Sequence, residues 1–237
     1  MIKKALALSF ILIFGLCIGN LYAFEKYGGN GYFLFSGHIV PFGDINSFLK
    51  RKGYPQLEAL PLSIGGGGYT IIGRIIIGGE GRGVITGGTG ENQNYKTSFS
   101  LGYGYINIGY NIFSTKQINL YPTVGIGGGA ISVSIEEKKR IPSSIDEAVK
   151  LENFPRKTEL SRGSLVLNIA IGGDYLLGKT DEKGAAGFIT GFRIGYILPV
   201  VNSRWSIEGT DLNKGPDLNL SGFYFSVVLG GGGSEIK

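Results

Sequence analysis

The sequence predicts an all-β protein, an eight-stranded antiparallel up-and-down barrel that crosses a membrane with its strands. Glycine supplies 42 of the 237 residues and charged residues only 17%, yet the mean hydropathy is positive, at +0.14. After the N-terminal segment, no apolar run approaches the roughly 18 residues that a membrane-spanning helix needs. Short segments in which apolar and polar residues alternate recur instead, and the connections between them are alternately short and long.

The N-terminal segment has the pattern of a secretory signal peptide. Lys3 and Lys4 precede an apolar run, and Ala23 is a small residue suited to the cleavage site. We therefore expect export of the chain and a final location in the outer membrane. The expected organisation has three parts: a signal peptide over 1–23, the barrel over 24–229 and a flexible Gly-rich tail over 230–237.

The scarcity of reactive residues excludes several classes of site. The chain has one cysteine, Cys17, and one histidine, His38, so we expect no disulfide framework, no metal site and no thiol chemistry. A formal net charge of +5 is too small for a nucleic-acid footprint. Gly173–Thr180 matches the spacing of a phosphate-binding loop, but a turn and another strand follow it instead of a helix. We expect no cofactor, nucleotide or nucleic-acid partner.

The alternating segments predict eight strands. They cover about 31–39, 62–72, 74–86, 97–112, 118–135, 163–177, 187–198 and 218–229. In the fourth of these the apolar residues change parity, since Leu101 is odd-numbered and Ile106 is even-numbered. One extra residue in a strand reverses the faces to which its side chains point. The change of parity therefore predicts a β-bulge near Tyr105.

The connections indicate the orientation of the barrel. Four of them have ten residues or more: loop one (about 40–61), loop two (87–96), loop three (136–162) and loop four (199–217). Outer-membrane barrels have short periplasmic turns and long external loops, so we expect both termini in the periplasm. Two loops carry helical patterns. In loop one Asp44 is expected to cap a helix over Ile45–Lys52, and in loop three Ser144 and Glu147 form a capping box.

These features together resemble the small eight-stranded outer-membrane barrel proteins, the group that contains OmpX, OmpW and the transmembrane domain of outer-membrane protein A. The resemblance covers the whole mature chain and rests on architecture. It implies a monomer that meets the barrel assembly machinery, outer-membrane lipids and lipopolysaccharide. The chain departs from the group at its C-terminus, where Phe223 and Phe225 alternate correctly but Gly230–Lys237 replaces the usual terminal aromatic residue.

Four charged residues fall within the expected strands: Glu80, Arg82, Asp174 and Arg193. A basic residue that faces lipid at the midplane costs about 2–4 kcal/mol, so we expect all four to point inward. There two acids and two bases neutralise one another. Because the interior of an eight-stranded barrel is filled by side chains, this interior charge cluster is expected to plug the lumen. A polar pathway for small ions is the alternative.

Small and aromatic residues are expected on opposite sides of the wall. Inward-facing glycines would make room for the larger polar side chains, and the candidates are Gly66, Gly68, Gly102, Gly104, Gly127–Gly129 and Gly172. Aromatic residues suit the girdles at the two lipid headgroup layers, and the candidates are Tyr69, Tyr103, Tyr110, Tyr121, Tyr175, Tyr196, Phe223 and Phe225.

The expected function is non-enzymatic, either structural or through the outer loops. The candidate surface residues are Phe48, Lys50, Arg51, Lys52 and Trp205, with the basic run suited to lipopolysaccharide phosphates and Trp205 to an exposed anchor. Two alternatives stay open. One is a channel for small solutes or hydrophobic molecules. The other is a lipid-modifying enzyme that uses His38 as a general base. Ser36 shares the strand parity of His38, but the sequence alone places no serine beside it and contains no Gly-x-Ser-x-Gly motif.

Overall fold

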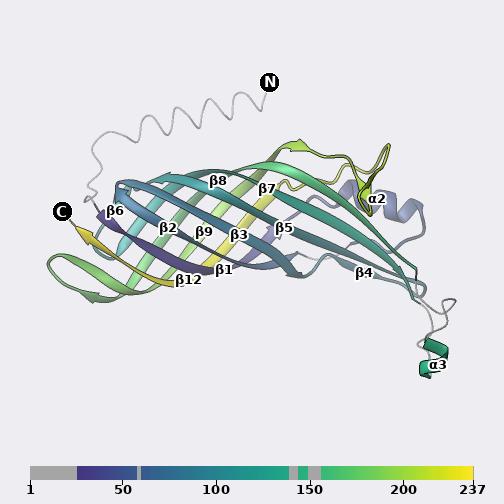
Figure 1. Ribbon diagram of the computed structural model, residues 1–237, viewed down its shortest axis with the longest axis horizontal. Helices are drawn as coiled ribbons and strands as arrows, with labels where there is room; N and C mark the ends of the chain where they lie inside the picture. The colour runs from purple at the N-terminus through teal and green to yellow at the C-terminus, as the bar shows by residue number, and fades with distance from the viewer. Residues whose placement is uncertain (1–25, 58–59, 139–143, 149–155, 237) are drawn as a thin grey trace.

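The structure is a closed barrel of eight long antiparallel strands, which confirms the predicted fold class (Figure 1). The computed structural model describes residues 26–57, 60–138, 144–148 and 156–236, so the expected signal peptide lies outside the described residues. The long strands are β1 (Lys26–Ile39), β2 (Leu62–Gly73), β3 (Ile75–Thr86), β5 (Tyr95–Tyr110), β7 (Ile118–Glu137), β8 (Lys157–Thr180), β9 (Gly184–Asn202) and β12 (Gly222–Ile236). Each pairs with the next, and β12 pairs with β1 to close the ring.

The two ends of the barrel differ. Figure 1 shows the start of β1 and the C-terminus at one end, which we call the terminal end, and the long connections at the other, which we call the loop end. The short elements are β4 (Thr89–Glu91), β6 (Phe113–Ser114), β10 (Ser206–Ile207), β11 (Thr210–Asp211), α2 (Gly43–Arg51) and α3 (Ile145–Ala148). Among the described residues, no helix is both long and apolar enough to cross a membrane.

The helices of loops one and three form where the sequence predicts them, but the predicted cap of α2 is wrong. Phe42 occupies the N-cap position and makes no side-chain capping hydrogen bond. Asp44 lies instead in the first turn, where a carboxylate is favoured by the positive end of the helix dipole. Glu147, the predicted capping-box partner of Ser144, has a side chain outside what the structure describes.

In the terminal half of the barrel, apolar side chains face outward. Phe33 on β1 is 71% exposed and Ile106 on β5 is 69% exposed, whereas alternate residues such as Leu34 and Tyr105 are buried. Ile171 on β8 and Phe225 on β12 continue the outward-facing apolar band. A water-soluble barrel would bury such residues, so this surface is suited to hydrocarbon.

The predicted bulge near Tyr105 is absent. Along β5 the odd-numbered residues are buried from Thr97 to Gly109 without interruption, and the pairing of β5 with β7 has no register shift. The shifts that the described strands do contain lie elsewhere, between Leu62 and Ser63 and between Leu165 and Val166. The same side of the strand therefore faces the lumen along its whole length. What changes along the strand is the polarity of the surroundings on each side.

The loop half of the barrel encloses an apolar core. On β5 and β7 the outward-facing residues here are small or polar, namely Ser98, Ser100, Gly102, Gly128, Ala130 and Ser132. The inward-facing residues join side chains from α2 and loop four in one buried cluster, whose members include Ile45, Leu49, Leu57, Phe99, Leu101, Ile131, Val133, Val166, Trp205, Leu218 and Leu220. The loops thus close this end of the barrel with a core of the kind found in soluble domains.

The predicted flexible tail over 230–237 is wrong, because β12 continues to Ile236. Gly230 pairs with Tyr32, and Ile236 pairs with Lys26 at the start of β1. A strand is held by its backbone ladder, so a glycine run can complete it. The glycine is also needed here: a Cβ added at Gly230 would lie 2.2 Å from the carbonyl oxygen of Gly31.

Candidate functional site

The four charged residues of the predicted interior cluster meet in the lumen. Glu80 and Arg82 lie on β3 at positions of the same parity, so both side chains point inward. Asp174 on β8 and Arg193 on β9 reach the same region from the opposite wall. None of the four is more than 8% exposed. We name this group the interior charge cluster.

Acids and bases alternate through the cluster. Arg82 Nη2 lies 2.5 Å from Glu80 Oε2, Arg193 Nε lies 3.5 Å from Glu80 Oε1, and Arg193 Nη1 lies 2.8 Å from Asp174 Oδ1. The formal charges cancel within the group. Burying an ion without a partner costs several kcal/mol, so this arrangement makes the four residues mutually dependent.

Tyrosines supply the hydrogen bonds that the carboxylates still lack. The hydroxyls of Tyr32 and Tyr105 donate to Glu80 at 2.8 and 2.9 Å. Those of Tyr69 and Tyr121 donate to Asp174 at 2.6 and 2.5 Å. Each buried carboxylate is therefore satisfied by basic and phenolic groups together, as buried charge requires.

The arginines are held in a similar way by rings and hydroxyls. The guanidinium carbon of Arg82 lies 4.3 Å from the ring centroid of Tyr224, and that of Arg193 lies 5.0 Å from the ring of Tyr121. Arg82 Nη1 also donates to Ser226 Oγ at 2.6 Å. Cation–π contacts of this kind are strongest where water is excluded. The cluster thus fixes side chains from strands all around the wall.

Three of the tyrosines were expected in the outer girdles, and this prediction is wrong. Tyr69, Tyr103 and Tyr121 point into the lumen and are at most 6% exposed. The outward-facing aromatics of the predicted set are Tyr110, Tyr175, Tyr196, Phe223 and Phe225. Strand parity was the signal that could have separated the two sets, since Tyr121 shares its parity with the inward-facing Gly125 and Gly127.

Inward-facing glycines make the room that these side chains use. A Cβ added at Gly172 would lie 2.8 Å from the Tyr121 ring and 2.9 Å from Arg193 Cδ, and one at Gly67 would lie 2.9 Å from Glu80 Cγ. Part of the predicted set of inward glycines faces the other way. Those that face outward are Gly66, Gly68, Gly102, Gly104 and Gly128.

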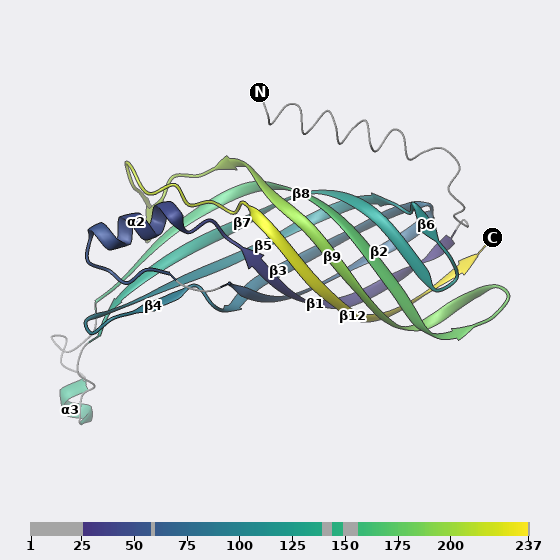
Figure 2. The same cartoon turned by 180° about the vertical axis from the view of Figure 1, so that it is seen from behind.

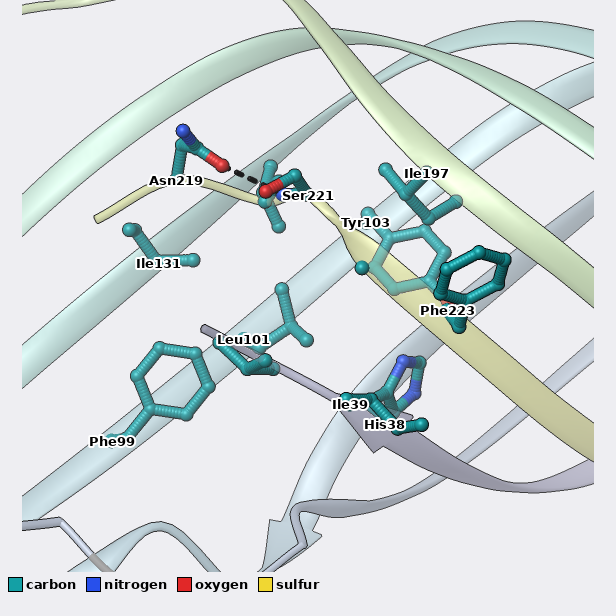
Figure 3. A pocket seen from close by; sticks show the side chains of 13 residues that line it. His38, Ile39, Phe99, Leu101, Tyr103, Ile131, Ile197, Asn219, Ser221 and Phe223 are labelled. Carbon is teal, nitrogen blue, oxygen red and sulfur yellow. Dashed lines mark hydrogen bonds between the residues drawn. The ribbon is translucent and has the colours of Figure 1, made fainter. Parts of the chain in front are cut away.

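His38 lies at the loop end of the interior, beside a narrow pocket (Figure 3). Its Nε2 is 2.7 Å from Ser63 Oγ. Ser36, which has the same strand parity as His38, bonds instead to Ser226 at 2.8 Å. No carboxylate of the described residues hydrogen-bonds to His38, so the group that would orient a general base is missing there. The pocket has a volume of about 10 Å³, room for about one water molecule.

The predicted loop-surface residues separate into three environments. Lys50, Arg51 and Lys52 are exposed at the end of α2, and Phe48 is half-buried against the apolar core of the loop half. Trp205 is buried, 5% exposed, and its indole N–H donates to Pro216 O at 2.9 Å. The prediction of an exposed anchor at Trp205 is therefore wrong, because loop four folds inward over the barrel and uses the indole to pack it.

The solved structures to which the chain is similar include three barrel proteins. The attachment invasion locus protein Ail of Yersinia pestis, in complex with the heparin analogue sucrose octasulfate, has 11% identity and a TM-score of 0.44 over 89% of this chain and 99% of that chain. Neisserial surface protein A has 11% identity and a TM-score of 0.41 over 89% and 97% of the two chains. The outer membrane protease OmpT from Escherichia coli has 10% identity and a TM-score of 0.35 over 90% and 95%. No protein-family model matches the sequence, and no curated protein matches it.

Proposed function

We propose that this chain is an outer-membrane β-barrel protein that acts without catalysis, with its lumen closed by its own side chains. The observation that carries the proposal is the inside-out distribution of the terminal half. Phe33 and Ile106 are exposed on its outer surface, while Glu80 and Arg193 are paired and buried at its centre. This distribution is stable only where hydrocarbon surrounds the wall.

The interior charge cluster supports a closed lumen. Its ion pairs join β3 to β9 and β9 to β8, and the tyrosine hydroxyls and rings extend the contacts to β1, β2, β5, β7 and β12. On the terminal side of the cluster, Lys26 donates to Asn119 Oδ1 at 3.0 Å beside a cavity of about 10 Å³. An ion would have to separate these partners in order to pass.

The loop end supports a role at the cell surface. Lys50, Arg51 and Lys52 project from α2 without an ion-pair partner among the described residues. A cluster of exposed basic groups attracts phosphate-bearing surfaces such as lipopolysaccharide, an interaction that salt screens. The apolar core beneath α2 holds this group in a fixed position.

Cell fractionation and conductance test the proposal together. The protein is expected in the outer membrane with a heat-dependent shift in gel mobility, and the wild type is expected to be silent in planar bilayers. Glu80→Ala with Arg82→Ala removes a buried pair and is expected to produce conductance steps. Glu91→Ala with Lys138→Ala removes an exposed pair of similar composition at the loop end and should stay silent. Steady conductance by the wild type would contradict a closed lumen.

One observation favours a second candidate, a lipid-modifying enzyme: His38 and Ser63 are within hydrogen-bond distance. Replacing His38→Ala and, separately, Ser63→Ala is expected to leave the lipid A and phospholipid profiles of the cell unchanged. A profile that changes in both variants, with the heat-dependent gel shift retained, would replace the non-enzymatic proposal with an enzymatic one.

A further inference from the structure

The rim at the terminal end contains a hollow beside the seam between β1 and β12. Its volume is about 530 Å³, within the usual range for ligand pockets. Figure 2 shows the β8–β9 hairpin projecting beside the C-terminal end of β12, and these segments form its walls together with the start of β1. Small residues form about half of its lining, namely Gly28, Gly184, Ala185, Ala186 and Gly233. We name this hollow the rim pocket.

Charged side chains of both signs line the rim pocket without pairing. Lys179 and Lys183 are exposed and form no ion pair among the described residues, and the same holds for Glu235. Asp181, the other acid of the lining, is engaged by the backbone, because its Oδ1 accepts the N–H groups of Lys183 at 2.9 Å and Gly184 at 2.8 Å. Two cations and one carboxylate are thus left for a ligand that carries charges of both signs.

The rim pocket lies where the apolar outer surface ends. Leu177 and Phe188 pair across β8 and β9 and are 48% and 50% exposed on the outside of the wall. Lys179 pairs with Ala186 two residues nearer the terminal end, about 7 Å further along the strand. In the membrane orientation of the proposed function, this is the headgroup level of the periplasmic leaflet.

A row of outward-facing glycines, which we name the trough, crosses four neighbouring strands near the rim pocket. Its members are paired in register across adjacent strands: Gly231 on β12, Gly31 on β1, Gly68 on β2 and Gly79 on β3. All four positions face outward. A Cβ added at Gly31 would meet nothing within 4 Å, and one at Gly231 would meet its nearest neighbour at 3.6 Å. At the inward-facing Gly232 the corresponding distance is 2.0 Å. Packing inside the barrel therefore does not require glycine at Gly31 and Gly231.

We propose that the rim pocket and this trough bind one phospholipid with a zwitterionic headgroup from the periplasmic leaflet. Lys179 and Lys183 contact its phosphate, Glu235 contacts its ammonium group, and one acyl chain lies along the trough. The inference rests on the membrane orientation of the proposed function. It adds a defined lipid site to a barrel whose lumen is closed.

Native mass spectrometry of the full-length protein tests this site. The protein is extracted from nanodiscs that contain equal amounts of phosphatidylethanolamine and phosphatidylglycerol, and retained lipid is counted. We expect one phosphatidylethanolamine per barrel. Lys179→Ala with Lys183→Ala should lower its retention about tenfold, as expected for lost hydrogen bonds to a charged group. Gly31→Leu with Gly231→Leu should lower it too, by filling the trough.

Gly102→Leu is the matched control for the trough variant. Gly102 also faces outward with space around it, since an added Cβ would lie 3.8 Å from its nearest neighbour, but it lies in the loop half. Its lipid retention should equal that of the wild type, and the heat-dependent gel shift shows that each variant is folded. Equal retention by the lysine variant, or a preference for phosphatidylglycerol, would overturn the proposal. A barrel that fractionates with the outer membrane but retains no phosphatidylethanolamine would overturn this inference alone.

Discussion

The two halves of the barrel are built with opposite polarity. In the terminal half, Phe33 and Ile106 face outward and the interior charge cluster fills the lumen. In the loop half, Ser100 and Ser132 face outward and an apolar core fills the interior. β5, β7 and β8 run through both halves, and the hydrogen-bond ladders between them have no register shift.

This comparison shows that the pattern of apolar and polar residues along a strand depends on what lies on each side of the wall. β5 carries inward-facing Leu101 and outward-facing Ile106 on one uninterrupted register. In the membrane setting of the proposed function, the reversal of its apolar parity marks the level where hydrocarbon outside the wall gives way to water. A hydrophobic pattern that changes parity in a transmembrane strand therefore has two readings, a bulge or the edge of the membrane.

The largest effect is expected at the centre of the interior charge cluster. Glu80→Gln keeps the side-chain shape but leaves Arg82 and Arg193 with one carboxylate between them, which should reduce the free energy of unfolding by about 3–5 kcal/mol. Urea unfolding of the refolded barrel measures it. A loss below about 1 kcal/mol, the range of exposed pairs, would show that water reaches the cluster.

Glu91→Gln is the control for that variant. Lys138 pairs with Glu91 at the loop end, and its hydrogen bond holds the pKa of this carboxyl below the ordinary value. Because both groups are exposed to water, loss of the pair should not change the unfolding curve measurably. Equal losses of unfolding free energy in the two variants would contradict the difference between a buried pair at Glu80 and an exposed pair at Glu91.

The next effect concerns the apolar core of the loop half. Trp205→Ala deletes a buried indole and should cost about 3 kcal/mol or slightly more, with faster proteolysis of loop four and an unchanged heat-dependent gel shift. The wild-type fluorescence offers an independent check, because Trp205 is the only tryptophan. Its emission should be blue-shifted and poorly quenched by iodide. Emission typical of water-exposed indole would contradict the buried position.

A pair of glycines compares the two faces of the wall. A Cβ at the inward-facing Gly65 would lie 2.0 Å from the carbonyl oxygen of Gly81, so Gly65→Ala should destabilise the barrel by about 1–3 kcal/mol. At the outward-facing Gly81 the nearest atom would be 3.8 Å away, and Gly81→Ala should fold like the wild type. Thermal gel-shift midpoints measure both. A larger loss at Gly81 than at Gly65 would reverse the assignment of faces.

The smallest effect on stability is expected at the end of α2. Replacing Lys50, Arg51 and Lys52 by Gln removes three exposed charges and should change the free energy of unfolding by about 0.5 kcal/mol or less. Binding of the purified barrel to lipopolysaccharide micelles should nevertheless weaken, and the difference from the wild type should shrink as salt is added. If the variant binds lipopolysaccharide as tightly as the wild type at low salt, these three residues do not contribute to a surface interaction.

Much of the fold follows from the sequence because a barrel strand is specified locally. Alternation placed all eight long strands, and the cost of a charge in hydrocarbon predicted inward positions for Glu80, Arg82, Asp174 and Arg193, which the structure shows buried. Each of these inferences needs only one strand and its surroundings.

The remaining errors concern groups whose environment depends on distant segments. Tyr69 and Tyr121 suited the lipid interface by type, but their partner Asp174 lies on another part of the chain. Trp205 is buried because loop four folds back against β8. The run from Gly230 has the low strand propensity of glycine, whereas its pairing with β1 is fixed by closure of the ring.

Cysteine labelling along β5 tests the change of polarity most directly. In a Cys17→Ser background, Ser100→Cys and Ile108→Cys place thiols on the same outer face of one strand, in the loop half and the terminal half respectively. On intact cells a membrane-impermeant maleimide should label Ser100→Cys and leave Ile108→Cys unlabelled, while a lipid-soluble maleimide should reach Ile108→Cys. Equal labelling of both positions by the impermeant reagent would contradict a wall whose terminal half is embedded in hydrocarbon.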